Sequence, residues 1–260
     1  MERTLLKPDS VIFPASFQEL THYDIYDSSC SAQASVYFID AEGGLFLKRA
    51  PKGALAREAA MTRFFHEIGL GAHVLAYESH EYDWLLTRRI AGEDCTHAAY
   101  RANPQRLCDV TAEQLRRLHD TPCIGCPVPN RTAEYLSQAA ENYAAKRYDI
   151  DLFPDNWGYS TPEEAWQVVE ENGKYLKNDT LLHGDYCLPN IILNNWNFSG
   201  FIDLDTSGVG DRHVDIFWGI WSLWFNLKTD AFRDRFLDVY GRQDVREELL
   251  RVIAAIEVFT

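Results

Sequence analysis

Residues 183–190 read HGDYCLPN, and two short apolar runs follow, at 191–193 and 200–204. The turn-rich stretch 194–199 separates the runs, and Asp203 stands near the end of the second, thirteen positions after the octet. Short apolar runs on either side of turn residues predict a β-hairpin. The tripeptide HGD alone occurs by chance, whereas the octet, the hairpin and the second aspartate together form a specific signal.

This spacing is that of the catalytic loop of kinases, HxDxxxxN, followed by the metal-binding aspartate beyond the next strand. Phosphoryl transfer to a hydroxyl requires a carboxylate that takes the hydroxyl proton, and Asp185 is the candidate base. A nucleoside triphosphate carries negative charges that Mg²⁺ offsets, and Mg²⁺ prefers hard oxygen ligands. Asn190 and Asp203 offer an amide oxygen and a carboxylate, and they are the candidate magnesium ligands.

A candidate phosphate-binding pair lies upstream. Residues 45–48 read LFLK and put Lys48 at the end of a predicted strand, and Glu58 lies in a helix predicted over about 54–68. A lysine paired with a helix glutamate can hold the α- and β-phosphates of a nucleotide. Alone, Lys48 would be an ordinary surface lysine, but the downstream motif favours the nucleotide role. No GxGxxG motif precedes it, because the segment 28–34 contains no glycine.

The pattern of elements changes near residue 90. Before it, the sequence predicts one helix and four strands, at 34–39, 45–48, 73–78 and 84–87. After Gly92 it predicts mainly helices, at about 104–119, 132–146, 162–173, 214–225, 231–240 and 245–259. The expected fold class is α+β with two lobes: a β-rich nucleotide-binding lobe at 1–90 and a mostly helical catalytic and substrate-binding lobe at 91–260.

Composition and net charge argue against some classes of binding partner. The 260 residues include 25 Lys and Arg against 39 Asp and Glu, a formal charge of −14 that argues against nucleic acid or an anionic membrane as partner. Most of the excess acid lies in 91–260, which suits a cationic ligand, although charge alone favours a solvated acidic surface. The most apolar run, 216–225, is ten residues long, too short for a membrane span. The N-terminus lacks a signal-peptide pattern, so a cytoplasmic location is expected.

The chain resembles the aminoglycoside 3′-phosphotransferases, antibiotic kinases of bacteria with a protein-kinase-like fold. The resemblance extends over nearly the whole chain, and it is carried by the segments 45–48, 57–58, 118–119, 155–157, 183–190, 199–203, 207–212, 215–216 and 256–259. It implies the two-lobed protein-kinase-like fold, ATP and Mg²⁺ as cofactors, and a cationic aminoglycoside of kanamycin or neomycin type as substrate.

The same resemblance implies roles for single residues. Asp185 would be the catalytic base, Asn190 and Asp203 would hold Mg²⁺, and Lys48 with Glu58 would order the phosphates.

Further roles follow from the same resemblance. Phe46 would lie against the adenine, and Arg88 and Ile90 in the linker would offer backbone groups to its edge. Asp155 and Glu257 match acidic positions that bind the ammonium groups of the drug.

The sequence departs from the family on the acceptor side. The residues after Asp215 read IFWGIWSLWFNLK, without the acids that the family usually presents there. Trp218, Trp221 and Trp224 recur at helical spacing, which favours packing in the core over stacking on a substrate ring. Two other functions therefore stay open: a kinase of the same fold that acts on another small alcohol (choline-like, sugar or other antibiotic), and a non-catalytic nucleotide-binding protein, against which the intact motif residues argue.

Overall fold

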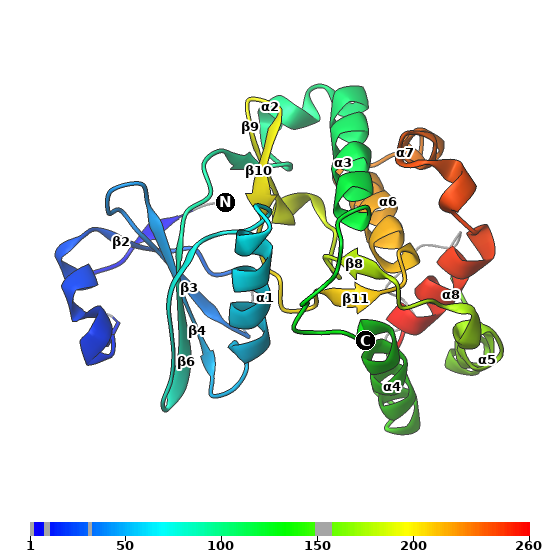
Figure 1. The fold of residues 1–260 in the computed structure, drawn as a ribbon, viewed down its shortest axis with the longest axis horizontal. Coiled ribbons are helices and arrows are strands. Elements are labelled where there is room, and N and C mark those ends of the chain that lie inside the picture. The colour runs from blue at the N-terminus through cyan, green and yellow to red at the C-terminus, as the bar shows by residue number, and fades with distance from the viewer. Residues whose placement is uncertain (1–2, 8–10, 31–32, 149–157) are drawn as a thin grey trace. The chain divides into compact units, whose positions relative to one another are not determined.

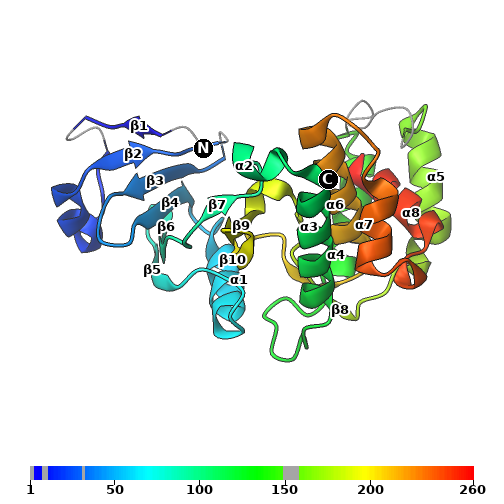
Figure 2. The same ribbon diagram turned by 90° about the horizontal axis from the view of Figure 1, so that it is seen from above.

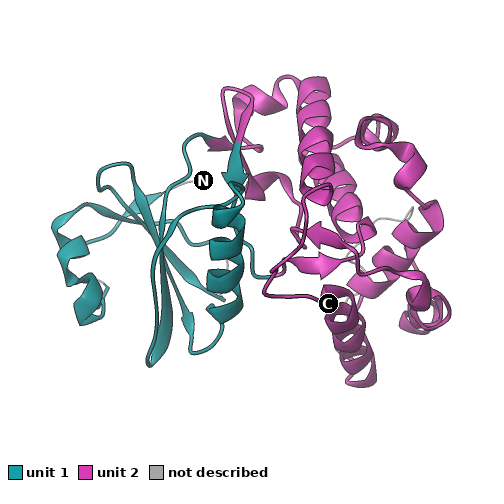
Figure 3. Cartoon of the chain, viewed as in Figure 1, with its two compact units in different colours: residues 1–92, 199–205 teal, residues 93–198, 206–260 magenta. Residues whose placement is uncertain are grey.

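The computed structural model describes residues 3–7, 11–30, 33–148 and 158–260 (Figure 1). The chain divides into two compact units, which Figure 3 distinguishes by colour. Unit 1 comprises 1–92 together with 199–205, and unit 2 comprises 93–198 and 206–260. The short segment 199–205, which contains Asp203, thus belongs to unit 1 although it lies far along the chain.

Unit 1 is built on an antiparallel sheet of six strands in the order β1-β2-β3-β4-β6-β5. The strands are β1 (Thr4–Leu5), β2 (Ile25–Asp27), β3 (Ser35–Ile39), β4 (Leu45–Pro51), β5 (Val74–Ser79) and β6 (Tyr82–Arg88). Helix α1 (Ala56–Glu67) and the 3₁₀ helix η1 (Ala15–His22) complete the unit. The sequence missed β1 and β2, which are only two and three residues long.

Different helices pack against the two faces of this sheet. One face packs a core that includes Phe17 of η1, Leu47 of β4 and Trp84 of β6. On the other face, Ala50 and Leu85 pack against Leu55 and Ala59 at the start of α1. Side chains alternate between faces along a strand, so Lys48, two positions before Ala50, lies on the α1 side. The strand pattern therefore directs Lys48 toward the helix that carries Glu58.

Unit 2 is mostly helical. Its helices are α2 (Ala98–Arg101), α3 (Pro104–His119), α4 (Arg131–Ala144), α5 (Pro162–Asn172), α6 (His213–Leu227), α7 (Arg233–Tyr240) and α8 (Glu247–Glu257). Helix α3 packs against α6 and α7, while α8 packs against α5 and α6 (Figure 2). Asn103, Asn130 and Thr161 accept bonds from the first turns of α3, α4 and α5, which explains why those helices begin there.

Small strands frame the catalytic motif. Strands β8 (Thr180–Leu182) and β11 (Gly208–Gly210) pair with each other, and β9 (Ile191–Asn194) lies between β7 (Glu93–Asp94) and β10 (Asn197–Phe201). The predicted strand 200–204 was wrong in its extent, because β10 ends at Phe201. Asp203 follows the strand in the left-handed backbone region, at φ +60°, which no strand accommodates. Among the described residues, no helix is long and apolar enough to cross a membrane.

Candidate active site

Lys48 lies at the centre of a charged cluster in unit 1. Its Nζ is 2.8 Å from Glu58 Oε2 and 2.8 Å from Asp203 Oδ1. Strand β4 supplies the lysine, the first turn of α1 supplies Glu58, and the segment after β10 supplies Asp203. The structure therefore brings together three residues that the sequence assigned to nucleotide phosphates and metal.

Burial and mutual attraction set the charges of this cluster. Burial raises the pKa of Glu58, and Lys48 opposes that rise. Burial alone would lower the pKa of Lys48, but the carboxylates of Glu58 and Asp203 raise it above its ordinary value. The ammonium group thus stays protonated at physiological pH and can bind phosphate oxygens.

Asp203 combines exposure with an uncommon backbone. Its side chain is 49% exposed, and one carboxylate oxygen is engaged by Lys48. A left-handed conformation costs a non-glycine residue about 1 to 2 kcal/mol. Such strained positions concentrate at functional sites, where the required placement of a side chain outweighs the cost.

In unit 2, the loop 183–190 is held in place through its backbone N–H groups. Asp215 at the start of α6 accepts two bonds from the loop, from the N–H of His183 (2.8 Å) and from the N–H of Gly184 (2.7 Å). Gly184 has φ +87°, and a Cβ atom there would lie 2.2 Å from the carbonyl oxygen of Thr206. The loop conformation therefore requires glycine before the candidate base.

Asp185 and Asn190 contact each other directly. The amide nitrogen of Asn190 donates to Asp185 Oδ2 (2.8 Å) and to the Asp185 carbonyl oxygen (3.0 Å). Because the nitrogen is used in this way, the Oδ1 atom of Asn190 faces elsewhere and can act as a ligand. His183 is fully buried, and its Nδ1 accepts from the backbone N–H of Asp185 (3.3 Å). Its position fits an orienting residue.

Two side chains, one in each unit, offer hard oxygens of the kind that Mg²⁺ takes from proteins. They are the Oδ1 atom of Asn190 in unit 2 and the half-exposed carboxylate of Asp203 in unit 1. Within the described part of the chain, no three His, Cys, Asp or Glu side chains gather as a metal-binding group. Mg²⁺ sites that use one or two protein ligands take the remaining oxygens from phosphates and water.

Two further side chains support the loop, and the motif spacing does not identify them as functional. His119 of α3 contacts Asp215 through Nε2 (3.2 Å) and the hydroxyl of Tyr240 through Nδ1 (2.8 Å). The Ser222 hydroxyl of α6 accepts from the buried N–H of Leu188 (2.9 Å). These residues act through the backbone or through Asp215, so no catalytic spacing reveals them. Only the pair 118–119, quoted for the family resemblance, pointed to His119.

Of the predicted substrate residues, Asp155 lies outside the described residues. Glu257 is 6% exposed, and both of its oxygens are occupied. The Tyr135 hydroxyl and Trp218 Nε1 donate to Oε1, and the Thr260 hydroxyl donates to Oε2 (2.5 Å). Burial raises the pKa of Glu257, although these donors oppose it. Its role toward an ammonium group stays a prediction, and the structure assigns this carboxylate internal partners.

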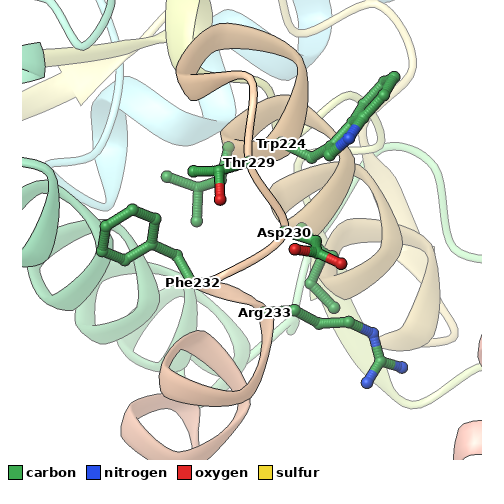
Figure 4. A pocket seen from close by; sticks show the side chains of 7 residues that line it. Trp224, Thr229, Asp230, Phe232 and Arg233 are labelled. Atoms are coloured by element: carbon green, nitrogen blue, oxygen red, sulfur yellow. The ribbon is translucent and has the colours of Figure 1, made fainter.

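The tryptophans of α6 pack mainly against each other. Trp218, Trp221 and Trp224 are all half-buried. The rings of Trp218 and Trp221 meet edge to face at 5.3 Å, and Trp221 stacks on Phe225 at 4.9 Å. The expected burial in the core is therefore only partial. Trp224 lines a small pocket at the end of α6, together with Ile220, Leu223, Thr229, Asp230, Phe232 and Arg233 (Figure 4). This pocket shares no residue with the catalytic loop.

The residues predicted to contact adenine differ in whether the groups concerned already have partners within the protein. Phe46 lies on the same sheet face as Lys48, two positions earlier, and its ring packs against Phe38 at 5.3 Å. The backbone N–H of Arg88 already donates to the His73 carbonyl (2.9 Å), so it is not a free donor for the adenine edge. The side chain of Ile90 closely approaches Gly200, where a Cβ would lie 2.7 Å from it. Backbone contacts of Ile90 with a nucleotide stay a prediction.

Comparison with known sequences gives a consistent result. A family model described as "Phosphotransferase enzyme family" matches residues 29–251. A probable aminoglycoside 3'-phosphotransferase of Lactococcus lactis subsp. lactis (strain IL1403) is 48% identical over 236 residues, which are 90% of each chain. An aminoglycoside 3'-phosphotransferase of Niallia circulans is 30% identical over 68% of this chain and 67% of its own.

Solved structures agree on the fold. The aminoglycoside-3'-phosphotransferase of type VIII has a TM-score of 0.72 and 25% identity, over 90% of this chain and 91% of its own. APH(3'')-Id of Streptomyces rimosus, solved with ADP and streptomycin, has a TM-score of 0.69 and 22% identity, over 86% and 88% of the two chains. The second likeness shows the fold alone. The predicted α+β, kinase-like fold is confirmed.

Proposed function

The chain belongs to the phosphotransferase enzyme family, and from that premise we propose that it transfers the γ-phosphate of ATP to a hydroxyl of a kanamycin- or neomycin-type aminoglycoside. The observation that carries the reaction class is the Asp185–Asn190 contact on a loop held by Asp215. That contact gives a carboxylate of fixed orientation beside an amide oxygen that can bind a cation. The acceptor class is supported by the names of the two relatives that are 48% and 30% identical.

In this proposal unit 1 binds the nucleotide. Lys48 holds the α- and β-phosphates, and Glu58 keeps its ammonium group in place. Lys48 also pairs with Asp203, so its ammonium group lies beside the carboxylate that is proposed to bind Mg²⁺. Phe46 lies on the same face and stacks against the base.

Unit 2 supplies the base. Asp185 accepts the proton of the acceptor hydroxyl as that oxygen attacks the γ-phosphorus, and the bond from γ-phosphorus to the bridging oxygen of ADP breaks. Asn190 and Asp203 would hold Mg²⁺, which would compensate the negative charge of the phosphates. Asp215 and Ser222 keep the loop in place through backbone contacts, so that the carboxylate of Asp185 remains oriented.

The test is ADP release from Mg·ATP in the presence of kanamycin, with the phosphorylated product identified by mass spectrometry. Asp185→Asn should lower kcat by about 10² or more, the contribution of a general base, and leave the Kd of Mg·ATP nearly unchanged. Asp40→Asn, which changes an exposed carboxylate of unit 1, is the matched control and should keep full activity. Near-normal turnover of Asp185→Asn would remove Asp185 from this role.

A second candidate is a kinase for an uncharged or singly charged small alcohol. Two observations favour it: Glu257 is occupied by internal donors, and the exposed part of α6 carries aromatic rings rather than acids. A parallel screen of sugars and choline-like alcohols decides between the two. Turnover with such an alcohol and none with any aminoglycoside would replace the first proposal by the second.

A further inference from the structure

Asp83 of β6 is a buried carboxylate for which catalysis has no evident use. Its exposed fraction is 0%. Oδ2 accepts from the backbone N–H of Leu55 (2.9 Å) and from the Tyr77 hydroxyl (3.0 Å). Burial raises the pKa of Asp83, but the Ser79 hydroxyl, the N–H groups of Gly53 and Leu55, and the Tyr77 hydroxyl outweigh that effect and lower it. The group is thus a buried anion, held by donors from β5 and from the chain that leads into α1.

The strand register places Asp83 on the same face as Lys48. Asp83 pairs with Ala50 across β4 and β6, and Lys48 pairs with Leu85. Paired residues share a face, and so do residues two positions apart on one strand. Asp83 and Lys48 are therefore two pairs apart on the face that α1 covers.

Helix α1 has no N-terminal cap from its own side chains. Asp83 of β6 instead binds the backbone N–H of Leu55, the residue before the helix. Leu55, the residue before the helix, has no side-chain oxygen, and no side chain of the helix caps it. The carboxylate of Asp83 accepts from the N–H of Leu55, immediately before the helix, and negative charge is favourable at a helix N-terminus. Glu58 lies three residues after Leu55, in the same first turn, and reaches Lys48 Nζ at 2.8 Å. One turn of helix is thus fixed to β6 at its start and to β4 by Glu58.

We propose that Asp83 is a positioning residue for nucleotide binding: it fixes the first turn of α1 so that Glu58 meets Lys48. The inference rests on the proposed nucleotide role of Lys48. Without the Asp83 anchor the first turn frays, Glu58 loses its fixed distance to Lys48, and the lysine is free to remain on Asp203. Affinity for the phosphates falls, while Asp185 and the acceptor are untouched.

The test compares Asp83→Asn with the control Leu86→Ala by titration of Mg·ATP and by steady-state kinetics. Asp83→Asn should raise the Kd and KM of Mg·ATP on the order of tenfold, the scale of one hydrogen bond to a charged group, and leave the KM of the acceptor unchanged. Leu86→Ala alters the opposite face of the same strand, so it should destabilise the fold without changing the Kd of Mg·ATP. Equal effects of both variants on this Kd would reduce Asp83 to a stabilising residue and overturn the proposal.

A double-mutant cycle locates the effect. If Asp83 acts through Glu58, then Asp83→Asn adds little to the loss of Mg·ATP affinity in Glu58→Gln, whereas independent effects would multiply. Should Asp83→Asn fail to fold, Tyr77→Phe removes one of the two bonds to Oδ2 and should raise the Kd two- to threefold; no change would overturn the proposal. Lys48→Ala distinguishes failure of the proposed function from failure of the role of Asp83. If Lys48→Ala leaves the affinity for Mg·ATP unchanged, the proposed function fails, and with it the premise of this inference.

Discussion

The absence of a side chain at Gly184 permits the conformation of the loop 183–190. Its φ of +87° suits glycine, and its Cβ position is 2.2 Å from the carbonyl oxygen of Thr206. Gly184→Ala adds both backbone strain and a clash with backbone that cannot rotate away. We expect it to lower kcat by more than tenfold and to lower the free energy of unfolding by about 2 to 4 kcal/mol, measured by urea denaturation.

Gly43 offers a matched control for that prediction. Its φ is +80°, but no atom lies within 4 Å of its Cβ position. Gly43→Ala should therefore cost only the backbone strain, about 1 kcal/mol, and leave kcat unchanged. If the two variants lost equal stability and equal activity, the close approach of Thr206 would have no role in holding the loop.

Asp203 yields different predictions for stability and for binding. Glycine adopts φ +60° without strain, but Asp203→Gly also removes the ion pair with Lys48, so the free energy of unfolding should change by no more than about 1 kcal/mol. It should also abolish Mg²⁺-dependent ATP binding, because it removes the carboxylate. Asn195→Gly, at φ +50° in a turn, is the control that should gain stability with normal binding. Normal Mg²⁺-dependent affinity in Asp203→Gly would contradict the assigned metal role.

Residues that carry chemistry could be predicted from spacing, and residues that hold others in place could not. The motif predicts roles for Lys48, Asp185 and Asn190, because phosphoryl transfer restricts the residue type at each position. The structure shows Lys48 beside Glu58 and Asp185 beside Asn190, and the roles stay predictions. Asp83 and His119 act on a backbone N–H or on another side chain, which many polar residues could do at many spacings. Such positions become visible only once the packing is known.

Helices and strands could be predicted where the sequence carries a local signal, such as an N-cap residue or a proline. Helices α3 and α5 carry an N-cap followed by proline, and the predicted ranges match them closely. Strands β8 and β11 have three residues each and pair with one another across a long stretch of chain, through contacts such as Val209 with Leu181. No local periodicity announces such a pair. For the same reason β7, which pairs with β9, was not predicted.

Three helices meet at His119, and their contact should respond to pH. Burial lowers the pKa of His119, against the Asp215 carboxylate that raises it, so the folded protein holds this histidine neutral. The unfolded chain takes up a proton there below about pH 6.5, which favours unfolding as the pH falls. We expect the free energy of unfolding to decrease below that pH, with His119 contributing up to about 1.4 kcal/mol per pH unit.

Urea denaturation at pH 7.5 and 5.5 measures this dependence. His119→Gln should weaken it, because glutamine does not titrate. His80→Gln, which changes a histidine side chain that is 70% exposed, is the matched control. An identical pH dependence in wild type and His119→Gln would show that other groups cause the acid sensitivity.

The charge of the whole molecule bears on its substrate. Of the net charge of −14, the larger part comes from residues 91–260. A polycationic acceptor should therefore bind more weakly as ionic strength rises, since the screening length falls from about 10 Å at 0.1 M to about 3 Å at 1 M salt. We expect the KM of kanamycin to increase several-fold over that range, measured by ADP release, with a smaller increase for an uncharged alcohol.

Glu257 should contribute little to this salt dependence. It is buried and bonded to Tyr135, Trp218 and Thr260, so Glu257→Gln should alter stability more than the salt sensitivity of the kanamycin KM. Asp155→Asn tests the other predicted acid. A salt dependence that disappears in Glu257→Gln would show that this carboxylate is a direct ligand after all.

Unit 1 is not continuous in sequence, and this affects how the protein can be made. Residues 1–92 leave the ribosome well before 199–205, and translation proceeds at roughly 5 to 20 residues per second. For several seconds the nascent sheet and α1 lack Phe201, whose ring meets Phe65 edge to face and whose N–H donates to the Leu70 carbonyl. Asp203 arrives with it. Until the hairpin emerges, Lys48 can pair with Glu58 but not with Asp203, and Phe65 of α1 lacks its contact with Phe201.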